Sequence, residues 1–153
     1  APPDGFELAA PADYAAHRIA VGVPEGGTDF GYGDAFPHDA DMDQLGGLDF
    51  RKGCYVGQEV VSRMEHRGTA RRRLIRIAST IDLPPTGTDV TAEGRVLGSV
   101  ASVAGKAGLA MIRLDRAREA LDANQAILAG GVPVTLAIPG WARFGWPEPA
   151  AAE

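Results

Sequence analysis

Hydrophobic and polar positions alternate through most of the second half of the chain. The alternation occurs in four segments: LIRIAS (74–79), DVTAEGRVLGSVASV (89–103), GLAMIRL (108–114) and GVPVTLAI (131–138). A period of two places every second side chain on the same face of a strand. Glu93-Gly94 divides the longest segment into two strands, and other glycine-containing turns separate the rest. The pattern predicts a small antiparallel barrel or sandwich with one short helix at DRAREALDA (115–123).

The first half of the chain follows a helical period at two places. Residues 12–22 (ADYAAHRIAVG) predict a short helix that ends at Gly22, and residues 54–66 (CYVGQEVVSRMEH) predict a second one. Residues 23–50, between them, contain six glycines and two prolines and show no clear period. The aromatic and leucine side chains scattered through this stretch predict an ordered loop that packs against the rest of the protein.

Composition narrows the class of protein. Of the 153 residues, 45% are hydrophobic and 23% are charged, which is typical of a globular domain and excludes a disordered or collagen-like chain. No apolar run approaches the roughly 20 residues that cross a bilayer, so we expect no membrane segment. The single cysteine excludes an internal disulfide framework and any four-cysteine metal site. The first residues, APPDGFELAAPADYAAHR, contain neither an initiator Met nor a signal peptide, and we expect a fragment or a processed chain.

Charge is distributed unevenly along the sequence. Residues 1–50 carry ten acids and one base, residues 51–76 carry eight bases and two acids, and the whole chain has a net charge of -5. Opposed blocks of this kind either neutralise each other in the fold or leave a basic surface for an anionic ligand or nucleic acid. The basic block includes six arginines that suit phosphate or carboxylate groups: Arg63, Arg67, Arg71, Arg72, Arg73 and Arg76.

Cys54 is the first candidate for chemistry. It follows Lys52-Gly53 and precedes Tyr55, at or near the start of the second predicted helix. A helix N-terminus and a neighbouring cation both stabilise a thiolate, which would make this thiol reactive. The alternative is a buried, inert cysteine that acts as a small apolar residue.

The sequence predicts no metal site. The histidines His17, His38 and His66 have no ligand spacing in common. Asp39, Asp41 and Asp43 alternate as in a calcium loop, but the glycine and the distal glutamate of that loop are not at the required positions. We therefore expect these acids to be solvated or to cap a helix.

The segment Lys52 to Glu59, KGCYVGQE, resembles the K-G-C-Y-x-G-Q-E signature of the YgfZ family, which are folate-binding relatives of the glycine-cleavage T-protein (aminomethyltransferase). The flanking sequence is similar too. Arg18 with Gly22-Val23-Pro24-Glu25-Gly26 resembles the family's R-x-x-x-G-[IV]-P-x-G, and Pro37 to Gly47 resembles its P-x-x-x-N-x-D/Q-x-L-G-G with Asp41 in the Asn position. Arg67-Gly68 and the terminal β region also fit, so the resemblance covers nearly the whole chain.

The resemblance implies an α+β architecture, the C-terminal part of a folate-binding GcvT-like fold. Residues 1–68 would be the end of the folate-binding α/β domain, and residues 69–153 a small antiparallel C-terminal β-barrel. Cys54 would be the reactive thiol and Lys52 its cation. The supporting signature residues would be Gly53, Tyr55, Gly57, Gln58 and Glu59, and the residues expected to bind tetrahydrofolate are Arg18, Glu25 and Arg67.

The function implied is that of a cytoplasmic accessory protein for iron–sulfur cluster assembly or repair, which supports tRNA modification indirectly. Its expected partners are folate, iron–sulfur proteins or their assembly factors, and an N-terminal domain that family members of about twice this length contain. One alternative is a folate-dependent aminomethyltransferase, although we expect no independent activity from this chain because the catalytic acid of the T-protein lies in the portion not present here. The other is direct RNA binding through the arginine block, which the acidic net charge disfavours.

Overall fold

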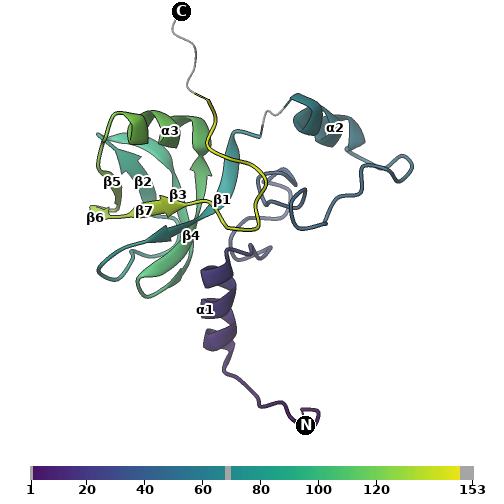
Figure 1. Cartoon of the computed structure of the whole chain (residues 1–153), viewed down its shortest axis with the longest axis horizontal. Coiled ribbons are helices and arrows are strands. Elements are labelled where there is room, and N and C mark those ends of the chain that lie inside the picture. The colour runs from purple at the N-terminus through teal and green to yellow at the C-terminus, as the bar shows by residue number, and fades with distance from the viewer. Residues whose placement is uncertain (1, 68–69, 149–153) are drawn as a thin grey trace, which may run out of the picture.

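The computed structural model describes residues 2–67 and 70–148, and of Arg67 only the backbone. A seven-stranded antiparallel sheet forms the main body, with helices at its margins (Figure 1). The strands are β1 (Arg72–Ala78), β2 (Asp89–Ala92), β3 (Arg95–Ala104), β4 (Ala107–Arg113), β5 (Ile127–Ala129), β6 (Val132–Pro133) and β7 (Thr135–Ala137). The helices are α1 (Pro11–Val21), α2 (Gln58–Arg67) and α3 (Leu114–Asp122).

The sheet curves into a nearly closed barrel. Its strand order is β6-β5-β2-β3-β4-β1-β7, so the two edge strands, β6 and β7, are separated in the sequence by Val134 alone. The backbone amide of Val134 donates a hydrogen bond to the carbonyl of Ile127 at 2.9 Å, and its side chain is buried. The two edges of the sheet are therefore held close to each other where the chain passes from one to the other.

Two hydrophobic clusters occupy the two faces of the sheet. The larger one fills the barrel and includes Ile75, Ile77, Val90, Leu97, Val100 and Ile112, together with Leu114, Ala117 and Ala120 of α3. The smaller one lies outside, where Ile19 of α1 packs with Leu74 and Leu109. Leu74 sits between Arg73 and Ile75 in β1 and faces the opposite way, as the period of two requires. Arg73 therefore shares the inner face of β1 with Ile75.

The structure confirms most of the predicted elements. The first helix is α1, the predicted alternating segments are strands, and DRAREALDA coincides with α3. Two boundaries were wrong: the second helix begins at Gln58 rather than at residue 54, and residues 131–138 form two short strands rather than one. The three-residue strand β5 was not predicted. Within the described residues, none of the helices has the length and apolar character that crossing a membrane requires.

Candidate functional site

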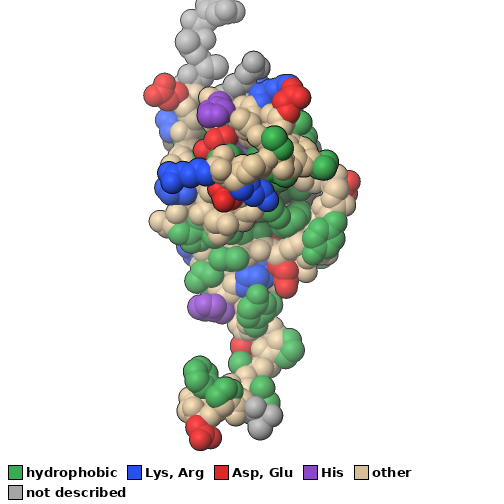
Figure 2. Space-filling model, turned by 90° about the vertical axis from the view of Figure 1, so that its right-hand side faces the viewer, with side chains coloured by type: hydrophobic (Ala, Val, Ile, Leu, Met, Phe, Trp, Pro, Cys, Tyr) green, Lys and Arg blue, Asp and Glu red, His purple; other side chains and the backbone are tan. Residues whose placement is uncertain are grey.

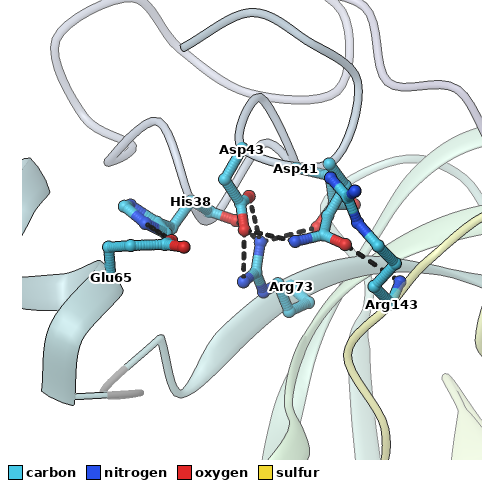
Figure 3. A network of polar contacts seen from close by, with 7 residues as sticks. His38, Asp41, Asp43, Glu65, Arg73 and Arg143 are labelled. Carbon is cyan, nitrogen blue, oxygen red and sulfur yellow. Dashed lines mark hydrogen bonds and ion pairs between the residues drawn. The ribbon is translucent and has the colours of Figure 1, made fainter. Parts of the chain in front are cut away.

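A network of acidic and basic side chains connects the loop before α2 to the start of β1 (Figure 3). Consecutive turns in residues 34–46 place His38, Asp39 and Asp41 in the interior. The loop joins the barrel through its backbone, because the amide of Leu74 donates to the carbonyl of Asp39 at 3.2 Å. This contact places the adjacent Arg73 under the loop.

Arg73 is the centre of the network. Its Nη1 donates to Oδ1 of Asp43 at 2.5 Å and to the carbonyl of His38 at 2.7 Å, and its Nη2 donates to Oδ2 of Asp43 at 3.0 Å. A longer bond of 3.3 Å joins Nη1 to Asp41. The guanidinium also lies 4.6 Å from the ring centre of Phe144, which supplies a cation–π contact. Only 6% of the Arg73 side chain is exposed, so these contacts replace its hydration.

The two aspartates bound by Arg73 titrate in opposite directions. Burial raises the pKa of Asp41 to about 7, against the smaller opposing effect of Arg73. Burial also pushes the pKa of Asp43 upward, but hydrogen bonds from Arg73 and Gln44 outweigh that effect and hold the pKa below its usual range. Asp41 has a positive φ of 57°, and its Oδ2 has no hydrogen-bond partner among the described residues. Asp43 is thus the charged partner of Arg73, whereas Asp41 is poised to hold a proton near neutral pH.

These contacts correct the expectation that the alternating aspartates are solvated or cap a helix. Asp39 and Asp41 are 2% and 0% exposed, and Asp39 accepts a bond of 2.6 Å from Arg72. Burial is possible because the basic strand that follows supplies a cation for the cluster. Arg72 and Arg73 of the basic block therefore neutralise acids of the preceding block, which agrees for these residues with one of the two readings that the charge pattern left open.

His38 extends the network toward α2. It is 1% exposed, and its Nε2 lies 3.3 Å from Oε2 of Glu65, whose side chain is 45% exposed. His38, Glu65 and Asp43 line one cavity of about 750 Å³, together with Phe50 and Phe144. This cavity lies between the loop, α2 and the C-terminal segment.

The signature segment projects as an exposed arm between this loop and α2. Cys54 is exposed and lies in irregular backbone, four residues before the first residue of α2. Burial of the thiol as a small apolar residue is therefore wrong, and so is its position at the helix start. The Lys52 ammonium lies 5.0 Å from the ring centre of Tyr55, and Val56 is 103% exposed.

Other signature residues are divided between helix and turn. Gly57 has a positive φ of 86° immediately before the helix, a conformation that glycine adopts without strain. Gln58 and Glu59 begin α2, and Glu59 accepts a bond of 2.5 Å from Arg63 one turn later. Both side chains of that pair are largely exposed, so it contributes little to stability.

The residues expected to bind folate do not form one group in this structure. Arg18 is 4% exposed, and its guanidinium donates to Asp29, to the carbonyl of Val23 and to Ser102 of β3. Glu25 is half-exposed and lies 3.5 Å from Arg18, and the side chain of Arg67 falls outside the described residues. Arg18 has an internal structural role here, so this geometry gives no fit for folate around it. Folate binding stays a prediction.

The arginine block does not form one continuous basic face in the described structure. Arg63, Arg72 and Arg73 each pair with a carboxylate. On the face of the molecule that carries α2, Lys and Arg side chains alternate with Asp and Glu (Figure 2). Arg71 and Arg76 are exposed and form no ion pair among the described residues, but two separate cations do not make the continuous basic surface that phosphate contacts need, so this arrangement gives little support to direct RNA binding.

Comparison with known proteins relates the barrel and the signature to one group. Residues 71–144 match the family model of the CAF17 C-terminal beta-barrel domain. The chain is 35% identical over 131 residues to the human iron-sulfur cluster assembly factor IBA57, mitochondrial, a match that covers 79% of this chain and 37% of the relative. The chain is similar to IBA57 factors. The mouse factor is 33% identical over 144 residues (90% of this chain, 39% of the relative), and the homolog from Coccidioides immitis is 35% identical over 129 residues (67% and 30%).

The IBA57 comparison corrects one expectation. The expected cytoplasmic location is wrong, because all three relatives are named as mitochondrial. The chain spans between 30% and 39% of the length of these three relatives.

Sequence reasoning missed part of the site. It singled out Cys54 but gave no role to His38, Glu65 or the pairing of Arg73 with Asp43. The only available indication was the reversal of charge between residues 1–50 and 51–76. That reversal indicates that acids and bases can pair, but it does not indicate which ones meet.

Proposed function

We propose that the protein containing this chain is an accessory factor for iron–sulfur cluster assembly, in which residues 52–59 contact the cluster-handling partner. The observation that carries the proposal is the similarity to IBA57 factors across the signature segment. A match that covers 79% of the chain must include Cys54, wherever it begins. The structure supports the same role because Cys54 is exposed on a projecting arm.

The thiol would act together with a partner. A cluster is held by several thiolates, and this chain offers one cysteine. Its exposure allows a partner's ligands to approach from the solvent side, and Gly53 adds no side chain beside it. Lys52 would supply positive charge near the thiolate if it left the Tyr55 ring, since its ammonium is exposed. The effect on tRNA modification would follow indirectly, through enzymes that need clusters.

The test of the thiol role is substitution in the full-length protein. Cys54→Ser and Cys54→Ala should abolish rescue of iron–sulfur enzyme activity in cells that lack the endogenous factor. Val56→Ala is the matched control, because Val56 is fully exposed on the same arm and occupies the variable position of the signature. Rescue by both Cys54 variants at the level of Val56→Ala would overturn the proposal for this residue.

Tetrahydrofolate is proposed as a ligand of the full-length protein only. The curated relatives are more than twice as long as this chain, and the residues described here do not assemble a folate site around Arg18. Calorimetric titration of the full-length protein with tetrahydrofolate should show binding that the 153-residue chain lacks or makes only weakly. Absence of binding in both proteins would rule out tetrahydrofolate as a ligand. The role of Cys54 would then be decided by the rescue experiment alone.

A further inference from the structure

We infer that His38, Asp43 and Glu65 form a binding site for a divalent transition-metal ion, independent of Cys54. The inference goes beyond the proposed function, which rests on the signature arm. The three side chains come from two places in the chain, the loop that carries His38 and Asp43 and the exposed side of α2. Figure 3 shows Glu65 beside His38 to the left of Asp43, with Arg73 below Asp43.

The distances suit one ion. The three side chains each offer a ligand atom, and these atoms all lie within 4.8 Å of one another. Nε2 of His38 and Oε2 of Glu65 are 3.3 Å apart. Two ligands that each lie about 2.1 Å from a tetrahedral ion are separated by roughly 3.4 Å, so this pair has the required separation already. Glu65 is 45% exposed, and its side chain is free to make the small adjustment that brings it nearer to Asp43.

His38 is the observation that points to a ligand rather than to a simple ion-pair cluster. The ring is 1% exposed, its Nδ1 has no hydrogen-bond partner among the described residues, and its Nε2 has one described partner, the half-exposed carboxylate of Glu65. The ring lies 6.3 Å from that of Phe50, and its unsatisfied nitrogen costs free energy in the interior without a compensating hydrogen bond. A metal ion at Nε2 would give the ring a strong bond directed into the cavity.

Glu65 is the acid left for a cation. The cavity is lined by two carboxylates, Asp43 and Glu65, and by two arginines, Arg73 and Arg143. Arg73 neutralises Asp43, whereas Glu65 forms no ion pair with an arginine among the described residues. Arg73 bonds both oxygens of Asp43 and Gln44 bonds Oδ2 as well, so Oδ1 is the oxygen that keeps a lone pair for a metal. The cavity of about 750 Å³ has room for waters to complete the coordination shell. One imidazole nitrogen with two carboxylates suits Zn²⁺, Fe²⁺ or Mn²⁺ better than Ca²⁺ or Cu⁺.

The test is calorimetric titration of the 153-residue chain with ZnCl₂, and with Fe²⁺ under anaerobic conditions. We expect one site, weakened at least tenfold by Glu65→Gln and by His38→Ala. The matched controls are Glu59→Gln and His66→Ala, which remove an exposed acid and an exposed histidine from the same helix and should bind as the wild type does. Cys54→Ala should also leave the affinity unchanged, which separates this site from the thiol of the proposed function.

A second measurement uses the wild-type chain, so it does not depend on whether the buried His38→Ala variant folds. In nitrogen-detected NMR spectra of the wild-type chain, Zn²⁺ should shift the ring nitrogens of His38 and leave those of His17 and His66 in place. Three results would each overturn the inference: no binding at millimolar Zn²⁺, equal affinity of the Glu65→Gln and Glu59→Gln variants, or loss of binding in Cys54→Ala.

Discussion

The guanidinium of Arg73 and the carboxylate of Asp43 are joined by two parallel hydrogen bonds, 2.5 Å from Nη1 and 3.0 Å from Nη2. The pair spans 30 residues of sequence and is buried on both sides, with 6% and 3% of the side chains exposed. It fixes the loop that carries His38 to the first strand of the barrel. The geometry of the candidate metal site therefore depends on how Arg73, which is not one of its ligands, holds Asp43, which is.

Replacing Arg73 by leucine should destabilise the protein strongly. The variant leaves Asp43 buried without its cation, and loss of one partner of a buried ion pair costs roughly 3–5 kcal/mol. Arg95→Leu is the matched control, because Arg95 pairs with Glu119 where both side chains are 55% exposed, and it should cost less than about 1 kcal/mol. Urea unfolding followed by circular dichroism gives both values. Equal losses would show that the Arg73 network adds no stability of its own.

The proton on Asp41 should make stability depend on pH. Its pKa is about 7 in the fold and about 4 in an unfolded chain, so the folded state retains a proton that the unfolded chain has released. The free energy of unfolding should therefore fall as pH rises from about 4 to 7, by at most about 1.4 kcal/mol per pH unit.

Asp41→Asn should flatten this profile, since the amide keeps the shape without the charge and asparagine tolerates the positive φ of this position. Asp34→Asn, at an exposed acid of the same region, should retain the wild-type profile. The measurement is a series of urea midpoints between pH 5 and pH 7.5 with a chelator present. A wild-type slope in Asp41→Asn would assign the dependence to another group.

The barrel could be predicted from the sequence, because the patterns that specify its strands and turns lie within short stretches of the chain. Alternation over four or more residues and Glu93-Gly94 at a tight turn specify strands wherever one face is buried. Strand β5 was not predicted, because its three residues, Ile127–Ala129, are too few to show a period. Residues 54–57 were assigned to a helix on the helical spacing of the apolar residues, yet Gly57 adopts a positive φ of 86° in a turn immediately before the helix begins.

The polar cluster could not be predicted from the sequence, because its contacts join residues that are far apart along the chain. His38 meets Glu65 across 27 positions and Arg73 across 35, and no local pattern encodes which of several acids will face a given arginine. The aspartates looked solvated because isolated acids usually are. Their burial depends on Arg72 and Arg73, which the fold supplies from strand β1, after helix α2 in the sequence.

Gly98→Ala should disrupt the centre of the sheet. A β-carbon at Gly98 would lie 1.9 Å from the carbonyl oxygen of Met111 in the neighbouring strand, and the backbone there has no room to move without breaking the ladder. We expect a loss of about 1–3 kcal/mol or more, from strain of the kind that overpacking causes. Gly140→Ala is the control, since a β-carbon there meets no atom within 4 Å. The measurement is the melting temperature of each variant. Equal melting temperatures for Gly98→Ala and Gly140→Ala would show that the strands separate more easily than the structure implies.

Removal of the Arg18 guanidinium should release α1 from the barrel without unfolding the barrel itself. Arg18 donates to Ser102 of β3 at 2.8 Å, and the amide of Ser102 donates to Asp29 at 2.9 Å, so one buried triad holds helix, loop and strand together. Arg18→Leu leaves the buried Asp29 without a cation, while the packing of Ile19 and the hydrogen bond from Trp141 Nε1 to the carbonyl of Val21 remain to hold the helix. Hydrogen exchange should therefore show lost amide protection in residues 11–21 and retained protection in β1 and β4. His17→Ala, an exposed neighbour on the same helix, should leave both unchanged. Wild-type protection of α1 in Arg18→Leu would mean that the remaining contacts, not the triad, hold the helix in place.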